Sequence, residues 1–251
     1  MQSVERAIAI LQAFSHTQPE RGVSELSREL GVHKSTVYRL LATLERHGLV
    51  ARNPETERYR LGLELLALAA QVAEHMDLRE IARPHLRALS ERCQETVNLA
   101  ILHGGQVMDI EQFAPPVRSI KNIGWVGRRM PAHCTAAGKV LLAHLPPEKL
   151  EQFLQSRLER LTPRTITDPD RLREELVRVR GRGYAVAQEE LEDGLNALAA
   201  PIYDHAGAVN AAVSLAGPAF RIPPTMFPHL ATLLLETCAK ISAEMGHRPR
   251  A

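Results

Sequence analysis

Apolar residues in the segment 31–50 recur with the period of an amphipathic α-helix. Positions i, i+3, i+4 and i+7 of one stripe are held by Val37, Leu40, Leu41 and Leu44. The side chains that face away from this stripe are polar or basic: Lys34, Ser35, Thr36, Tyr38, Arg39 and Thr43. The pattern predicts a helix that buries one face and presents a basic, hydrogen-bonding face to solvent.

A second short helix is predicted just upstream, at residues 23–30 (VSELSREL). Ser24 is its expected N-cap, because a hydroxyl can accept a hydrogen bond from a free N–H of the first turn. Gly31 supplies the left-handed residue that ends the helix. Two short helices joined by a tight glycine turn are typical of a helix-turn-helix, whose second helix enters the DNA major groove. An ordinary helical hairpin on a protein surface is the alternative.

Residues 49–53 and 57–61 have the alternation of two short strands about a turn at 54–56. Such a hairpin predicts the wing of a winged helix-turn-helix and weakens the alternative of a simple helical hairpin. Its basic residues, which can reach phosphates or the minor groove, are Arg52, Arg58 and Arg60. The alternative is that these arginines lie on a solvated strand edge and do not contact DNA.

Two further helices flank this motif. Residues 3–16 predict a first helix with a core face of Val4, Ala7, Ile8 and Leu11. Residues 62–75 are rich in Leu and Ala and are apolar around most of the helix girth. Because such a helix needs a partner, we expect a linker helix that pairs with another protomer or packs under a second domain. Pairing would bring two recognition helices to two half-sites of one DNA duplex.

The apolar period changes repeatedly beyond residue 77. Helices are expected at 77–93, 135–144, 147–156, 170–180 and 228–245. Strands are expected at 96–102, 106–113, 117–123, 184–190, 197–204 and 208–217, with turns at 103–105 and 204–207. This order predicts an α+β domain with one central antiparallel sheet. The expected organisation is a DNA-binding domain at 1–61, a linker helix at 62–76 and an effector-binding domain at 77–251.

Charge is divided unevenly between these parts. The chain is 45% hydrophobic and 24% charged, as is usual for a soluble globular protein. Residues 1–61 carry nine Lys and Arg against seven Asp and Glu, so residues 62–251 carry 22 of each. The small positive excess therefore lies where a protein that binds DNA would need it.

The number and spacing of the cysteines and the lack of a long apolar run indicate a cytoplasmic protein. Cys93, Cys134 and Cys238 are odd in number and widely spaced, which argues against a disulfide framework and a zinc finger. The sequence contains no run of about 18 apolar residues, so we expect no membrane span. We also expect no signal peptide before the first helix. No Walker-type or dinucleotide glycine loop is present. We expect a cytoplasmic protein with no cofactor and no membrane partner.

Residues 130–139 (MPAHCTAAGK) form a loop of small residues that opens onto a helix, with Thr135 as the expected N-cap. Free N–H groups and the positive end of the helix dipole make such a start a receptor for carboxylate. Tight packing of a helix on a sheet is the alternative. Residues 189–194 (EELEDG) are expected to form a solvated loop.

Several motifs resemble one known family. SVERAIAILQAF, SELSRELGVHKSTVYRLLATLERHGLV and YRLG resemble the DNA-binding domain of IclR-type (isocitrate lyase regulator) bacterial transcription factors. PAHCTAAGKVLLA, RGRGYAV, GLNALAAPIYD and AAVSLAGPAFR resemble their effector-binding domain. The resemblance implies a winged helix-turn-helix followed by a GAF-like domain. It also implies binding to double-stranded operator DNA and to a small-molecule effector, and the linker helix predicts a homodimer or homotetramer.

Roles on the DNA side follow from the predicted recognition helix and wing. Arg39 and Lys34 should contact phosphates or guanine, and the neighbouring hydroxyl-bearing side chains should set the register. The complete expected DNA-binding set is Ser24, Lys34, Ser35, Thr36, Tyr38, Arg39, Arg52, Arg58 and Arg60.

On the effector side, the resemblance implies a pocket between the sheet and the loop 130–139, in which family members hold small organic acids. Carried over by motif, its lining is Thr135, Ala136, Ala137, Ala187, Leu195, Ala197, Ser214 and Ala216. Small-acid sensors of the family commonly carry Asp at the position of Ala187, and Cys or Ser at the positions of Ala197 and Ala216. Loss of those polar groups predicts a bulkier or more apolar effector, such as an aromatic acid.

Two other function classes compete with a regulator. An enzyme would use Cys134 as nucleophile beside His133, but no third orienting group is evident, so a buried structural cysteine and a surface histidine are favoured. Metal binding by His133, Cys134 and His144 lacks a recognisable ligand spacing. A ligand-independent DNA-binding protein would not need the larger second domain. We therefore predict a ligand-controlled transcription factor, a repressor or an activator, rather than an enzyme.

Overall fold

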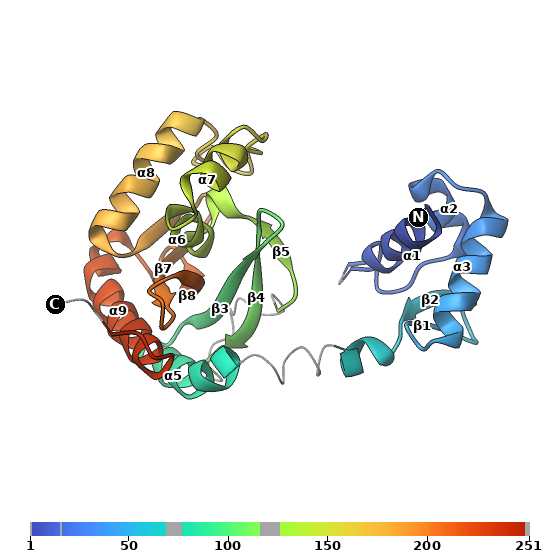
Figure 1. The fold of residues 1–251 in the computed structure, drawn as a ribbon, viewed down its shortest axis with the longest axis horizontal. Helices are drawn as coiled ribbons and strands as arrows, with labels where there is room; N and C mark the ends of the chain where they lie inside the picture. The colour runs from blue at the N-terminus through green and yellow to red at the C-terminus, as the bar shows by residue number, and fades with distance from the viewer. Residues whose placement is uncertain (1, 16, 69–76, 116–125, 249–251) are drawn as a thin grey trace. The chain divides into compact units, whose positions relative to one another are not determined.

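The computed structural model describes residues 2–15, 17–68, 77–115 and 126–248 (Figure 1). The chain divides into two compact units, Met1–Met76 and Asp77–Ala251. Within the expected linker helix, residues 64–68 are helical, and the part from residue 69 onward lies outside the described residues. The strand expected at 117–123 also lies outside them.

Up to residue 61, the described part of the first unit forms three helices and a two-stranded hairpin. Its elements are α1 (Gln2–Gln12), α2 (Val23–Leu30), α3 (Lys34–Arg46), β1 (Val50–Arg52) and β2 (Tyr59–Leu61). β1 and β2 pair antiparallel, with Ala51 opposite Arg60. The core of the unit gathers Ile10, Phe14, Leu26, Val37, Leu41, Leu44, Val50 and Tyr59. The predicted helix-turn-helix and its wing are confirmed.

The predicted core face of α1 is right for Ala7 and Leu11, which pack against the core, and wrong for Val4 and Ile8. Ile10 is fully buried and Phe14 nearly so, whereas Val4 is 65% exposed and Ile8 is 49% exposed. Apolar residues occupy two overlapping stripes of this helix, and the stripe that contains Ile10 packs in the core. The sequence pattern alone does not distinguish between the two stripes.

The predicted N-cap of α2 is also wrong. The cap is Gly22, in an extended conformation, and its N–H donates to the Glu25 carboxylate at 3.3 Å. Because this carboxylate bonds back to the cap, the helix begins at Val23, two residues earlier than a Ser24 cap would allow. Ser24 is therefore in the first turn, where it is exposed. Gly31 has a φ of 62° and ends the helix as predicted.

The second unit is built on a six-stranded antiparallel sheet with the order β5-β4-β3-β8-β7-β6. Its strands are β3 (Thr96–His103), β4 (Gln106–Phe113), β5 (Arg129–Pro131), β6 (Ala185–Gln188), β7 (Leu195–Tyr203) and β8 (Val209–Pro218). Its helices are α5 (Asp77–Cys93), α6 (Ala136–Ala143), α7 (Pro147–Leu154), α8 (Pro169–Arg182) and α9 (Phe227–Glu244). Short 3-10 turns occupy Ala132–Cys134 and Pro224–Met226. The predicted α+β class with a central antiparallel sheet is confirmed.

Strand alternation gives this unit two cores, one on each face of the sheet. Helices α5 and α9 cover one face, over residues that include Leu99 and Val213. Helix α6 packs on the opposite face, over residues that include Ala100 and Ala199, and α8 packs against α6 (Figure 1). The face under α6 carries smaller side chains, which leaves space between the helix and the sheet.

The two predicted hairpin turns of this unit are confirmed. Gly104 and Gly105 join β3 to β4 with φ angles of 59° and 77°, a conformation that favours glycine. Between β7 and β8, the N–H of Asp204 donates to the carbonyl of Ala208, and Gly207 has a φ of 80°. Among the described helices, none has the length and apolar character needed to cross a bilayer.

Candidate functional site

The exposed face of α3 begins at a histidine cap. Nδ1 of His33 accepts a hydrogen bond from the Ser35 N–H at 3.3 Å and lies 2.8 Å from Ser35 Oγ. This cap satisfies one free donor of the first turn and fixes where the helix begins. Val37, Leu41 and Leu44 are buried against the core, so the opposite side of α3 faces solvent.

The predicted contact residues of α3 gather in its N-terminal half. Lys34, Ser35, Tyr38 and Arg39 are exposed, and Thr36 is half-buried. Tyr38 exposes 53% of its surface, which is high for a large aromatic side chain. The face therefore presents two cations, hydroxyl groups and one ring, which are the groups that read phosphates and base edges.

The three predicted wing arginines differ in their surroundings. Arg52 forms an ion pair with Glu57 across the hairpin turn. Nη2 of Arg58 lies 2.9 and 2.7 Å from the two carboxylate oxygens of Glu25 on α2. Arg60 is exposed and forms no ion pair within the described residues. Arg60 is thus the wing arginine with a guanidinium available to a phosphate, whereas Arg58 joins the wing to α2.

Arg21 also holds the wing in place, and sequence reasoning gave it no role. Its backbone exchanges two hydrogen bonds with Tyr59, at 2.8 and 2.9 Å. Its side chain is 9% exposed, donates to the Ala13 carbonyl at 2.7 Å and forms an ion pair with Glu29. A single arginine in a polar connection carries no sequence signal for such a role, because its partners come from three separate segments.

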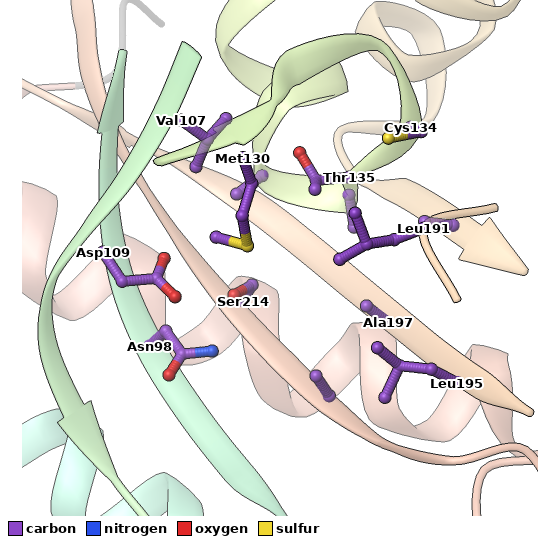
Figure 2. A pocket seen from close by; sticks show the side chains of 14 residues that line it. Asn98, Val107, Asp109, Met130, Cys134, Thr135, Leu191, Leu195, Ala197 and Ser214 are labelled. Carbon is purple, nitrogen blue, oxygen red and sulfur yellow. The ribbon is translucent and has the colours of Figure 1, made fainter. Parts of the chain in front are cut away.

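A cavity in the second unit lies between the sheet and the segment that leads into α6 (Figure 2). It holds about 480 Å³ of empty space, counting its open mouth. All eight residues that the sequence assigned to an effector pocket line it: Thr135, Ala136, Ala137, Ala187, Leu195, Ala197, Ser214 and Ala216. The fold therefore brings together residues from one helix start and three strands.

The floor of the cavity is apolar on one side and polar on the other. Ala187 of β6 lies opposite Ala197 of β7, which lies opposite Ala216 of β8. Their side chains end at Cβ, so they leave space above this part of the sheet. Ser214 lies two residues back along β8, opposite Asn98 of β3, and begins the polar side.

The start of α6 forms another wall of the cavity. Thr135 caps the helix as predicted: its Oγ1 accepts from the Gly138 N–H at 3.1 Å and donates to the Pro131 carbonyl at 3.3 Å. The N–H groups of Ala136 and Ala137 occupy the first two helical positions, where the helix itself offers no acceptor. The cavity wall therefore presents N–H groups that have no acceptor within the helix, at the positive end of a helix dipole, which favours a carboxylate.

Six lining residues were missed by sequence reasoning: Asn98, Val107, Asp109, Met130, Cys134 and Leu191. Asp109 is the most unusual of them, since it is only 2% exposed. Burial raises the pKa of its carboxyl to about 7. Asp109 stands between Met108 and Ile110 in β4, but this strand also carries Gln106, Glu111 and Gln112, so its sequence carries no clear signal for a buried acid.

The segment 189–194 is not simply solvated, and the sequence prediction is wrong at Glu190 and Leu191. Glu190 is buried and forms an ion pair with Lys139 of α6, which is 1% exposed. Nζ of Lys139 also donates to the Val186 carbonyl at 3.0 Å. Burial raises the pKa of Glu190, and the adjacent ammonium opposes that shift. The pair turns the segment inward, and Leu191 becomes part of the cavity wall.

The chemistry around Cys134 does not suit a nucleophile. Burial raises the pKa of its thiol to about 12, whereas a reactive thiolate needs a lowered pKa. His133 is 3% exposed, so the prediction of a surface histidine is wrong. Its Nε2 lies 2.8 Å from the Glu159 carbonyl oxygen. Within the described residues, no cluster of three or more His, Cys, Asp or Glu is arranged to hold a metal ion.

Comparison with known proteins gives a consistent result for both units. Residues 3–54 match the family model of the IclR helix-turn-helix domain, and residues 70–243 match that of the bacterial transcriptional regulator IclR C-terminal domain. The chain is 34% identical over 248 residues to the HTH-type transcriptional regulator XynR of Escherichia coli, covering 98% of each protein.

Solved structures agree with this similarity. An IclR transcriptional regulator from Alicyclobacillus acidocaldarius matches with a TM-score of 0.87 at 30% identity, covering 98% of this chain and 99% of that one. An IclR homologue from Microbacterium hydrocarbonoxydans, crystallised with 4-hydroxybenzoate, matches with a TM-score of 0.85 at 28% identity, covering 97% and 98%. The curated relative and these two neighbours are all described as regulators or regulator homologues rather than enzymes.

Proposed function

This chain belongs to the IclR family of bacterial transcriptional regulators, and we propose that it binds operator DNA as a homo-oligomer under the control of a carboxylic acid with an apolar body. Membership establishes a helix-turn-helix DNA-binding domain followed by a ligand-binding domain. The observation that carries the proposed effector class is the cavity, which combines a free helix N-terminus with a floor of alanines. Its site of action is the cytoplasm, where the operator lies.

On the DNA side, the exposed half of α3 supplies the base-reading contacts. Arg39 and Lys34 contact phosphates or guanine, and Tyr38 and the hydroxyl groups beside it set the register. Arg60 supplies the phosphate contact of the wing, because its side chain is exposed and forms no ion pair within 4 Å among the described residues. Arg58 instead keeps the wing docked on α2 through Glu25.

Arg39→Ala should weaken operator binding by about 1–3 kcal/mol, roughly 5- to 150-fold, because a bidentate or charge-assisted base contact is lost. The measurement is fluorescence anisotropy with a duplex from the region upstream of the protein's own gene, compared with a scrambled duplex of equal length. Arg46→Ala is the matched control, since Arg46 is exposed in the last turn of the same helix. An Arg39→Ala protein with unchanged operator affinity would remove Arg39 from the reading face.

A second comparison separates the wing arginines. Arg60→Ala should reduce the affinity for the operator duplex and for the scrambled duplex by the same factor. It should also reduce the slope of log K against log salt by about 1, as expected for one lost phosphate contact. Arg58→Ala should act mainly by loosening the wing, which thermal unfolding would register. If only Arg58→Ala changed the salt slope, Arg58 rather than Arg60 would be the wing arginine that contacts phosphate.

Assembly into a homodimer or homotetramer is supported by exposed apolar side chains after the wing. Leu63, Leu66 and Leu68 are 81%, 68% and 44% exposed, and large apolar groups gathered in this way mark association surfaces. Pairing of this segment between protomers would give the regulator two reading heads for two half-sites. Sedimentation analysis of the full chain tests the assembly.

On the effector side, the carboxylate accepts hydrogen bonds from the N–H groups of Ala136 and Ala137, and the apolar body lies over Ala187, Ala197 and Ala216. The binding of 4-hydroxybenzoate by the Microbacterium homologue supports an aromatic acid as the class. Binding shifts the equilibrium between arrangements of the DNA-binding domains by no more than its differential affinity for them. A gel shift with the operator duplex, titrated with aromatic and short-chain acids, tests this control.

Ala187→Asp should weaken the binding of benzoate at least 10-fold, because a carboxylate added to the alanine floor repels the anionic ligand and fills its space. Calorimetry on the full chain measures the affinity. Ala239→Asp is the control, since Ala239 is exposed on α9 and receives the same charge. Equal affinities for wild type and Ala187→Asp would exclude contact between the acid and this floor.

A further inference from the structure

Three polar side chains of the cavity form a group that we call the polar corner: Asn98, Asp109 and Ser214. Their residues are 4%, 2% and 6% exposed. Ser214 lies directly opposite Asn98 in the sheet, and Asp109 lies on the next strand, β4, opposite Ala100. Figure 2 shows the carboxyl of Asp109 and the amide of Asn98 close to each other on the sheet, apart from Thr135 at the start of α6.

The hydrogen-bonding capacity of this corner is largely unused. Oδ1 of Asn98 accepts from Nε2 of Gln112 at 2.8 Å. Within the described part of the chain, the Asp109 carboxyl, the Ser214 hydroxyl and Nδ2 of Asn98 form no hydrogen bond. These atoms face the open cavity rather than packed protein, so a hydrogen-bond partner for them has to come from the cavity. Three such groups facing one cavity therefore indicate a polar group of a ligand.

A β-bulge aims Asp109 into the cavity. The register of β3 with β4 shifts between Leu99 and Ala100, so Leu99 lies opposite Glu111 and Ala100 lies opposite Asp109. In a regular strand Asp109 and Glu111 would share a face. The extra residue instead sends Glu111 to the other face, where Arg79 Nε lies 2.8 Å from its carboxylate. Bulges that redirect a side chain in this way are common beside functional sites.

The charged groups on the surrounding elements are either paired with another group or exposed, and the exposed ones include Arg128, which follows the bridge between Val126 and Asp109. Glu111 of β4 interacts with arginines of α5, and Lys139 of α6 is paired with Glu190. Arg129 of β5 is exposed, and His103 lies at the exposed end of β3. Strand β8 carries no ionisable side chain. Burial alone raises the pKa of Asp109 to about 7, and an anionic ligand in the same cavity would favour the neutral carboxyl further.

We propose that the polar corner is a second recognition point of the cavity, which selects acids that carry a hydroxyl group at the end away from the carboxylate. This inference rests on the proposed function, in which the carboxylate lies at the start of α6. The hydroxyl donates to the carbonyl oxygen of the neutral Asp109 carboxyl. Ser214 and Nδ2 of Asn98 donate to the hydroxyl oxygen. Asp109 is the specificity-determining residue of the corner.

The test compares 4-hydroxybenzoate with benzoate by calorimetry on the full chain at pH 6. Wild type should bind the hydroxy acid about 10-fold more tightly, the effect of one well-formed buried hydrogen bond. Asp109→Leu should lose most of this preference, because it keeps the bulk and removes the acceptor of the ligand hydroxyl, while Ser214 and Asn98 remain. Asp170→Leu, at an exposed position of α8, should retain the wild-type preference.

The pH dependence gives a second readout that a purely structural role would not change. Between pH 6 and pH 8.5 wild type should lose about 10-fold in affinity for both acids, because Asp109 ionises and repels the ligand carboxylate. Asp109→Asn cannot ionise and should show a flat profile in this range while it keeps the preference for the hydroxy acid. Ser214→Ala, which removes a single oxygen, should reduce the preference without affecting benzoate.

The outcomes separate the two proposals. If wild type binds both acids equally, or if Asp109→Leu or Ser214→Ala retains the full preference, the polar corner is overturned and the proposed effector class stands. If folded wild type binds neither acid, the effector class itself fails and the corner fails with it. Should Asp109→Leu not fold, the Asp109→Asn pH profile and the Ser214→Ala preference decide the question.

Discussion

Replacing Gly138 with alanine is expected to prevent stable folding of the second unit, or to lower its free energy of unfolding by about 4 kcal/mol or more. A Cβ at this position would lie 2.1 Å from the Ala132 carbonyl oxygen and 2.5 Å from the Ala132 Cα. Both atoms belong to the backbone of the turn that leads into α6. Every residue of α6 is buried, so the helix has no free direction in which to move.

Urea unfolding followed by circular dichroism measures this effect. Gly181→Ala is a matched control, because Gly181 lies in α8 and an added Cβ would meet no atom within 4 Å. There the same change should stabilise the protein by roughly 0.5–1 kcal/mol, the usual preference of a helix for alanine. If Gly138→Ala unfolded at the wild-type urea concentration, α6 would not pack against the Ala132 turn as described.

The elements that depend on local pattern were predictable from the sequence. The helix-turn-helix follows from one apolar stripe and a glycine that ends α2, and the hairpin turns follow from paired glycines or an Asp–Gly turn. The core face of α1 was predictable only in part: Ala7 and Leu11 pack on the core as predicted, but Ile8 and Ile10 mark different stripes, and only the docking against α3 decides between them. Tertiary contact, rather than periodicity, selected Ile10.

The cavity was predictable only in part, for a similar reason. Motif resemblance identified the start of α6 and the strand residues opposite it, all of which line the cavity. Asp109 was not predicted as a lining residue, because the face to which its side chain points depends on a β-bulge. The alternating pattern of β4 does not reveal that bulge. Glu190 was missed because its partner Lys139 lies 51 residues earlier, and a buried ion pair between such distant positions has no local signature. The acidic run around Glu190 is typical of a solvated loop until that partner is known.

Lys139→Met should destabilise the second unit by about 3–5 kcal/mol at pH 8, because it leaves the Glu190 carboxylate buried without its partner. Methionine keeps the length of the side chain, so the loss reports the charge rather than a cavity. Without the ammonium, the pKa of Glu190 in the folded state rises further above its unfolded value. A carboxyl with a raised folded pKa costs stability at high pH, and that cost decreases as the pH falls through the folded pKa. The deficit should therefore be smaller at pH 5 than at pH 8.

The double variant Lys139→Met/Glu190→Gln separates the loss of a charge partner from the loss of packing. With both charges removed, most of the stability should return and the difference between pH 5 and pH 8 should disappear. Lys149→Met, at an exposed position of α7, is the control for removal of a lysine. The unpaired Glu190 carboxylate of the single variant should turn toward solvent and draw Leu191 from the cavity wall, whereas the neutral amide of the double variant can stay buried. The single variant should therefore bind benzoate more weakly than the double variant does. A single variant as stable as wild type at pH 8, or a double variant no better than the single, would show that Glu190 is solvated and that the pair does not fix this wall of the effector cavity.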